Sequence, residues 1–239
     1  MTAPAQWLSA FPLQQAQGAV TALIEGWTEL AAVHRPHFNA STKEPGLTKR
    51  LKIFVENEVA RRHGLLGMWS TEDIIGDVDP LTGALVEERR TDIVYGWNDA
   101  SQGIQLVFEF KRLGRQKKHR THYLEDSGLR RFVTGIYGRR QAVAAMVGVL
   151  LDPEDEVVPP IRKALEDSTL AGSLKVRPLA TGENYCRPSS MFSAADFDTD
   201  HDRPATASAG MGPIRVSHIF LPFGYPTSTV KPKTPKGSV

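Results

Sequence analysis

The chain has little cysteine and no long apolar run. Its 239 residues include a single cysteine, Cys186, which excludes an intrachain disulfide and a zinc site built on paired thiolates. This composition is typical of a reducing compartment, so we expect the protein in the cytoplasm. The longest apolar run, 142–151, is shorter than the roughly 18 residues that a membrane-spanning helix needs. Because the N-terminus also lacks the basic flank and apolar centre of a signal peptide, we expect neither membrane insertion nor export.

Nucleotide-binding glycine motifs and internal repeats are also missing from the sequence. The formal net charge of +2 indicates little about partners, but basic residues gather between 111 and 140. A local excess of positive charge attracts polyanions, although a solvated helix face explains it equally well when the cluster is taken alone. The substrate class therefore has to be inferred from other residues.

Hydrophobic periodicity predicts one α/β domain with a central sheet. We expect helices at 14–33, 47–63, 122–137 and 159–167, and strands at 84–90, 91–97, 104–111, 141–151, 174–177 and 216–221. The expected organisation is an N-terminal helical segment at 1–40, a main domain at 41–225 with a long surface loop at 186–213, and a flexible basic tail at 226–239.

The strands 91–97 and 104–111 flank a turn-rich loop, NDASQG, and predict a hairpin. If it closes symmetrically, Trp97 faces Ile104 and Asp92 lies opposite Glu109. Cross-strand Cβ atoms are about 4.5–5.5 Å apart, so two carboxylates there oppose folding unless a cation lies between them. Because side chains alternate along a strand, Lys111 shares a face with Glu109. Oxygen ligands of this kind favour Mg²⁺ (or Mn²⁺).

A third carboxylate is expected from the helix 47–63. On an α-helical wheel Glu58 falls close to Leu51 on the apolar stripe, so we expect it to point inward. The alternative is a partly exposed Glu58 paired with Arg61 or Arg62. For the strand residues, the alternative is an ordinary ion pair between Glu109 and Lys111.

Asp92, followed by Glu109-Phe110-Lys111 at the end of the next strand, resembles the PD-(D/E)xK nuclease superfamily, with Thr91 where the family name has proline. The resemblance implies a restriction-endonuclease-like fold, a mixed central sheet flanked by helices. Its core is a helix, a three-stranded meander, a helix and a further strand, which matches the expected order over 47–151. It also implies that Asp92 and Glu109 bind the metal, that Lys111 positions the attacking water, and that Glu58 is the helix carboxylate.

These residues predict a Mg²⁺-dependent phosphodiesterase, a nuclease acting on DNA with RNA left open, in repair or in prokaryotic antiviral defence. The residues expected to contact the nucleic-acid backbone are Arg112, Arg115, Lys117, Lys118, Arg120, Tyr123, Arg130 and Arg131. Tyr123 is also compatible with a place in the core. The competing class is a non-catalytic nucleic-acid-binding or assembly module that keeps the same sheet. A homo-oligomer or a regulatory protein partner is left open.

The acidic run 196–202, DFDTDHD, resembles the start of a calcium-binding loop. The sixth position of such a loop is a glycine and the twelfth a glutamate, but this chain has His201 and Ala207 there. The calcium interpretation fails on both positions. We expect a solvated acidic loop instead.

Overall fold

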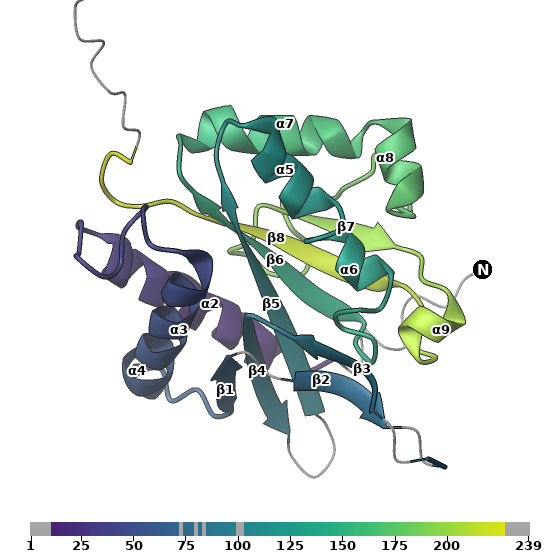
Figure 1. Cartoon of the computed structure of the whole chain (residues 1–239), viewed down its shortest axis with the longest axis horizontal. Coiled ribbons are helices and arrows are strands. Elements are labelled where there is room, and N and C mark those ends of the chain that lie inside the picture. The colour runs from purple at the N-terminus through teal and green to yellow at the C-terminus, as the bar shows by residue number, and fades with distance from the viewer. Residues whose placement is uncertain (1–10, 72–73, 79–80, 83–84, 99–102, 228–239) are drawn as a thin grey trace, which may run out of the picture.

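A computed structural model describes residues 11–71, 74–78, 81–82, 85–98 and 103–227. They form an α/β fold around a six-stranded mixed sheet of order β1-β4-β5-β6-β8-β7 (Figure 1). The strands of this sheet are β1 Met68–Thr71, β4 Ile93–Asn98, β5 Gly103–Leu113, β6 Val143–Leu150, β7 Phe197–His201 and β8 Ile214–Leu221. A separate two-stranded ladder joins β2 Ile74–Val78 to β3 Leu85–Arg90. The expected α/β class with a mixed sheet is confirmed.

Helices cover both faces of the sheet. The described helices are α2 Leu13–Ala31, α3 Glu44–Phe54, the π-helical segment η1 Val55–Val59, α4 Ala60–Arg62, α5 Lys117–Leu124, α6 Arg130–Val133, α7 Glu154–Leu165, α8 Ser168–Ser173 and α9 Ala205–Ser208. Within this set, none combines the length and the apolar character that crossing a bilayer requires.

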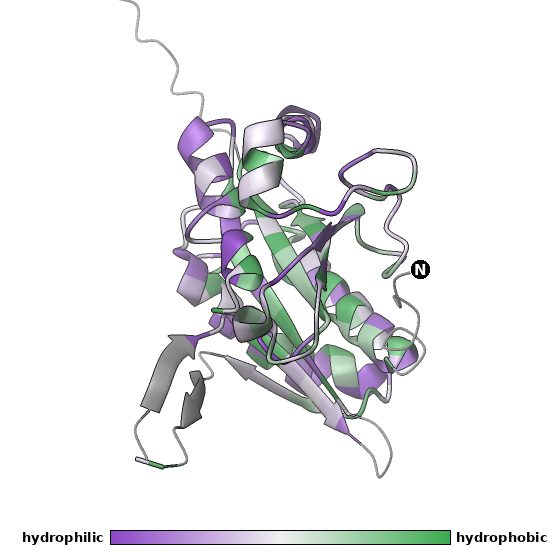
Figure 2. Ribbon diagram, turned by 90° about the vertical axis from the view of Figure 1, so that its right-hand side faces the viewer, coloured by the Kyte–Doolittle hydropathy of each residue, from purple (hydrophilic) through white to green (hydrophobic). Residues whose placement is uncertain are grey.

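Two apolar cores lie on the two faces of the sheet. One packs α2, α3 and η1 against β5, β6 and β8, so the N-terminal helix shares a core with the sheet. The other packs α5, α6 and α7 against the opposite face. Figure 2 shows the apolar residues concentrated in the central strands between these layers. Because β6 is covered on both sides, all of its residues are buried, as its continuous apolar run predicts.

The hairpin of β4 and β5 has the predicted register. Trp97 pairs with Ile104 and Ile93 pairs with Phe108, and Phe108 and Phe110 face the core formed with α2 and α3. After β5 the chain passes through α5 and α6 and returns in β6, which is parallel to β5. This order of elements places the start of α5 next to the end of β5.

The predicted single helix 122–137 is wrong, because the chain forms α5 and α6 with a break between them. Gly128 lies in this break, where an added Cβ would meet the carbonyl oxygen of Tyr123 at 2.1 Å. The close approach of two backbone segments therefore ends the helix. Position 128 requires glycine at this contact.

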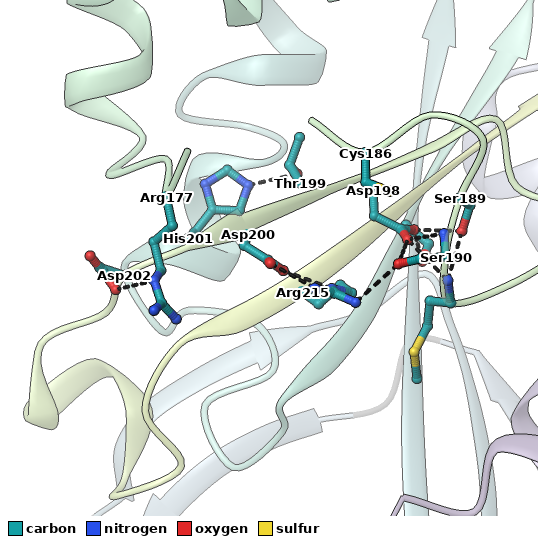
Figure 3. A network of polar contacts seen from close by, with 12 residues as sticks. Arg177, Cys186, Ser189, Ser190, Asp198, Thr199, Asp200, His201, Asp202 and Arg215 are labelled. Carbon is teal, nitrogen blue, oxygen red and sulfur yellow. Dashed lines mark hydrogen bonds and ion pairs between the residues drawn. The ribbon is translucent and has the colours of Figure 1, made fainter. Parts of the chain in front are cut away.

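The predicted surface loop 186–213 is also wrong, since it contains β7 and α9. Its acidic run contains all of β7, and its aspartates have separate partners. Asp196 pairs with Arg162 and Arg187, Asp200 with Arg215, and the exposed Asp202 with Arg177. These contacts, two of which are drawn in Figure 3, hold the edge strand to its neighbours.

Asp198 is the buried member of this acidic strand, with 2 % of its surface exposed. Its carboxylate accepts hydrogen bonds from the hydroxyls of Ser189, Ser190 and Ser217 and from the backbone amides of Ser190 and Met191, at 2.7 to 3.1 Å. Figure 3 shows these donors converging on it. The carboxylate replaces lost hydration with protein donors, which lets a charge remain in the interior.

Two smaller expectations also differ from the structure. The strand predicted at 174–177 is reduced to an isolated bridge between Val176 and His201. The helix predicted at 159–167 begins earlier, as α7, at Glu154. Most of the tail expected at 226–239 lies outside the described residues, which end at 227.

Candidate functional site

The hairpin register places Asp92 across from Glu109. Asp92 directly precedes β4, and extending the observed pairs outward by one step sets it opposite Glu109 on β5. The predicted hairpin register is therefore confirmed, and its last pair, Ile93 with Phe108, directly adjoins the two acidic residues. It follows from the alternation of side chains along two strands joined by a symmetric turn.

Beyond Phe108, β5 continues without a β4 partner, and its backbone amides need other acceptors. The amide of Phe110 donates to Oδ2 of Asp92 at 2.8 Å, and that of Arg112 donates to Oε2 of Glu44 at 3.1 Å. Two carboxylates thus take the place of the missing strand. This arrangement fixes both side chains at the free edge of β5.

Lys111 lies among these acidic groups. Its Nζ donates to Oε1 of Glu109 at 2.6 Å, to the carbonyl oxygen of Phe110 at 2.7 Å and to Oε1 of Glu44 at 3.3 Å. An ammonium has three hydrogens, so these acceptors occupy its whole donor capacity. The amine is consequently held in one orientation beside Glu109.

The two carboxyl groups of the hairpin, Asp92 and Glu109, both have raised pKa values. Burial, together with the charge of Asp92, raises the pKa of Glu109 to about 8 against the opposing effect of Lys111. Burial likewise raises the pKa of Asp92 to about 6. Burial lowers the pKa of Lys111, but the charges of Glu109, Glu44 and Asp92 outweigh it and raise the value overall. The Lys111 ammonium is therefore charged. It does not fully offset the cost of burying Asp92 and Glu109 in their charged forms, so their pKa values stay raised.

Glu109 has one oxygen without a partner. The residue is 2 % exposed, and its Oε2 has no hydrogen-bond partner in the part of the chain that the structure describes. Such a buried acceptor costs free energy until a donor or a cation binds it. This oxygen, next to a second carboxylate, fits a divalent cation.

The cation would take few ligands from the protein itself. The described residues contain no group of three or more His, Cys, Asp or Glu side chains suited to a metal. Asp92 and Glu109 would supply two carboxylates, and water and substrate oxygens would complete the shell. Mg²⁺ is commonly held in this way, by one or two carboxylates with several waters.

The expectation that Glu58 points inward is wrong. Glu58 is exposed, whereas Val55 and Val59 are buried. The amide of Ala60 bonds to the carbonyl oxygen of Val55, so the helix makes a π turn here. This wider turn changes the angle between successive residues, and a wheel drawn for an α-helix misplaces Glu58.

Glu44 occupies the place expected for the helix carboxylate. It stands in the first turn of α3, followed by Pro45. Proline near a helix start and an acidic residue in the first turn are both typical of N-termini. These signals could have shown that the helix begins before residue 47, and therefore that Glu44 belongs to it.

The residues expected to contact nucleic acid divide into two groups. Lys117, Lys118 and Arg120 on α5 have no ion pair among the described residues, and both lysines are exposed. The other arginines have protein partners: Arg112 donates to the carbonyl oxygen of Ala40, Arg115 pairs with Asp152 and Glu156, Arg130 pairs with Asp126, and Arg131 donates to the carbonyl oxygen of Asp126.

Tyr123 does not belong to this surface. It is 0 % exposed, and its hydroxyl lies 2.9 Å from Nδ1 of His218. The expectation that it reaches the substrate is wrong, and the alternative place in the core is correct. The residue faces the sheet because α5 packs its apolar side there.

The site thus consists of Asp92, Glu109 and Lys111 from the hairpin and Glu44 from α3. Sequence reasoning found the first three and missed the fourth. The chain was also compared with known proteins. No family model, no curated protein and no solved structure matches it.

Proposed function

We propose that the chain is a metal-dependent nuclease of the restriction-endonuclease-like type, with DNA as its substrate. The observation that carries the proposal is the convergence of Asp92 and Glu109, in cross-strand register, on a buried position that leaves one oxygen of Glu109 unpartnered. A lone structural ion pair between Glu109 and Lys111 would not account for the buried, unpartnered Oε2 of Glu109.

The order of elements supports the same proposal. Helix α3, the antiparallel strands β1, β4 and β5, the helices α5 and α6, and the parallel strand β6 follow one another as in the core of the PD-(D/E)xK superfamily. The ladder of β2 and β3 is inserted between the first two of those strands. The acidic and basic residues lie on the strands where that superfamily carries its motif.

In the proposed reaction a water oxygen bonds to phosphorus and the bond from phosphorus to one sugar oxygen breaks. One proton of the water passes to solvent, and the departing oxygen takes a proton from solvent. A bound Mg²⁺ ion would polarise the phosphodiester and lower the pKa of coordinated water. Lys111 would exchange its longest bond, the 3.3 Å bond to Glu44, for the attacking water, and it offsets developing negative charge.

The unpaired cations of α5 provide the proposed path for the nucleic-acid backbone. Lys117, Lys118 and Arg120 follow the end of β5 by a few residues, so a strand whose phosphate lies at the site would pass them. Phosphate contacts of this kind do not read bases, and the affinity falls as salt rises because bound counterions are released. Binding without sequence preference is expected.

The first test compares cleavage of plasmid and single-stranded DNA with Mg²⁺, Mn²⁺ or EDTA. Wild-type protein should cleave only with a divalent cation, and Lys111→Ala should lower the rate by about 100-fold or more while DNA binding persists. Glu58→Gln is the matched control, since it removes an exposed carboxylate outside the site and should leave the rate unchanged.

Cation binding itself gives a second readout. Mg²⁺ at about a hundredfold its dissociation constant should stabilise the wild-type protein by about 2.7 kcal/mol, and Asp92→Asn should lose that gain. A non-catalytic binding module would show no such gain and would leave both DNA substrates intact, which would contradict the proposed function.

A further inference from the structure

Arg131 lies beside the acidic site without a carboxylate of its own. Its Nε donates to the carbonyl oxygen of Asp126 at 2.9 Å, and its Nη1 donates to the hydroxyl of Tyr137. Within the described residues it forms no ion pair, and its Nη2 has no hydrogen-bond partner. The guanidinium is therefore anchored through two donors while a third remains available.

The neighbouring Arg130 differs in this respect. Its Nη1 pairs with Oδ1 of Asp126 at 2.8 Å, and its Nη2 donates to the hydroxyl of Ser173 at 3.1 Å. Its charge is thus met by a carboxylate, and its outer donors point to the side of α8. Two adjacent arginines on one short helix consequently have different surroundings.

Tyr137 holds Arg131 from a second segment. The guanidinium carbon of Arg131 lies 5.3 Å from the centre of the Tyr137 ring, and the amide of Tyr137 donates to the carbonyl oxygen of Arg131 at 3.0 Å. The ring is 3 % exposed and packs edge-on against Phe132 at 5.7 Å. This packing leaves the phenol little freedom, so the guanidinium it binds is fixed as well.

The turn after α6 brings Tyr137 back to Arg131. Gly135 and Gly138 have φ values of +77° and +62°, which side chains rarely adopt. At Gly135 an added Cβ would also meet the carbonyl oxygen of Ala207 at 2.3 Å. The conformation of this turn is therefore fixed by its two glycines and by packing against α9.

Packing places the pair on the face of the sheet that carries Glu109. Tyr137 shares one apolar core with Val107, and Val107 lies two residues from Glu109 on the same face of β5. Burial and the charge of Glu109 raise the pKa of Tyr137, which agrees with this placement. The hydrogen bonds of Arg131 to Asp126 and Tyr137 anchor the guanidinium but do not neutralise its charge. Its planar donor fork matches phosphate oxygens, which an ammonium does not do.

We propose that Arg131 is a catalytic residue of this site, which binds a non-bridging oxygen of the reacting phosphodiester, and that Tyr137 is its positioning residue. The inference rests on the proposed nuclease function. Negative charge grows on the non-bridging oxygens as water attacks, so a donor fixed in advance stabilises the transition state more than the bound substrate. The arginine therefore acts on kcat more than on KM.

The test compares kcat and KM of Arg131→Ala, Arg131→Lys and Tyr137→Phe on a DNA substrate with Mg²⁺. Removing one donor of this type costs about 100-fold or more in kcat, which is expected for Arg131→Ala with a nearly unchanged KM. Tyr137→Phe keeps the ring and loses the anchoring bond, so about a tenfold loss is expected. Arg61→Ala, which removes an exposed arginine of α4 outside the site, is the control and should retain the wild-type kcat.

Binding of inorganic phosphate, measured by calorimetry with Mg²⁺, gives a readout that does not need turnover. Wild type and Arg61→Ala should bind it more tightly than Arg131→Ala and Tyr137→Phe. Arg131→Lys keeps the charge and guards against a folding defect in the alanine variant; it should recover phosphate binding only in part.

The outcomes separate the two proposals. An active wild-type protein with unchanged kcat and phosphate affinity in Arg131→Ala and Arg131→Lys would overturn the role of Arg131 and leave the nuclease function standing. A wild-type protein that cleaves no DNA with any divalent cation would overturn the nuclease function, and the inference with it.

Discussion

Glu44 shows how one side chain can serve two elements. One oxygen accepts the backbone amide of Arg112 at the free edge of β5, and the other accepts Nζ of Lys111. It is a charged acceptor, 24 % exposed at the side chain, in the first turn of α3. The helix and the end of the strand are therefore joined by a single carboxylate.

We expect Glu44→Ala to lower the free energy of unfolding by about 1–3 kcal/mol, because it leaves two donors of β5 without an acceptor. Glu58→Ala, a change to an exposed carboxylate, should remain within about 0.5 kcal/mol of wild type. Urea unfolding of both variants measures the difference. Equal stability of the two would show that Glu44 does not link α3 to β5.

At the scale of elements, β7 is an edge strand that depends on polar contacts. Its acidic residues have different partners: Asp198 accepts from serine hydroxyls and backbone amides, and Asp200 pairs with Arg215. Asp202, just after the strand, pairs with Arg177. An edge strand with charged residues also resists pairing with other chains. The composition that predicts a solvated loop is thus compatible with an ordered strand.

Asp198 in β7 and Asp202 just after it should respond differently to mutation. Asp198→Ala removes a buried acceptor of several hydrogen bonds, and we expect it to destabilise the protein by about 3 kcal/mol or more. Asp202→Ala breaks an exposed pair, which should cost about 1 kcal/mol or less. Thermal unfolding of the two variants tests this, and a milder effect at Asp198 than at Asp202 would contradict it.

At the scale of the whole molecule, a buried chain of hydrogen bonds connects α5, β8, β7 and the turn after α8. The carbonyl oxygen of Leu174 only accepts, so Nδ1 of His201 must donate to it, at 2.8 Å. Nε2 of His201 then accepts from the hydroxyl of Thr199, which in turn accepts from Nε2 of His218. Nδ1 of His218 accepts from Tyr123. Every donor in the chain has an acceptor only while both histidines are neutral.

Acid should therefore weaken the contribution of these histidines to stability. Burial lowers the pKa of His201 to about 4, against the raising effects of its bond to Leu174 and of the charges of Asp200 and Asp202, and burial lowers that of His218 as well. Unfolded histidines bind protons with a pKa of about 6.5, so at these residues the unfolded chain holds more protons between about pH 6.5 and pH 4. As the pH falls through that window, His201 alone lowers the free energy of unfolding by about 3 kcal/mol. The raised pKa values of Glu109 and Asp92 act in the opposite direction, because these groups bind protons more readily in the folded state.

Urea unfolding at about pH 7 and about pH 4.5 measures this effect. His201→Gln removes the contribution of His201, so its stability relative to wild type should rise between about pH 7 and about pH 4.5. His122→Gln, which changes an exposed histidine, should keep the wild-type pH dependence. If the dependence on pH were the same in His201→Gln and wild type, the buried histidines would not be the cause.

Local patterns were sufficient for the hairpin. Two strands of alternating side chains on either side of a short polar loop admit one register that buries the apolar face, and this register alone brings Asp92 to Glu109. The continuous apolar run of β6 likewise determined that both faces of the sheet are covered. Because these features depend on neighbours along the chain or across one turn, the sequence by itself decided them.

Contacts between distant segments were decided by the tertiary structure. A π turn, which no residue pattern marked, sent Glu58 to solvent, while the packing of α3 brought Glu44 to the end of β5. Tyr137 reaches Arg131 only because a glycine turn packs on α9. The partners of β7 come from segments far apart in sequence. Such contacts depend on how helices and strands pack together, and periodicity along one segment carries no information about that packing.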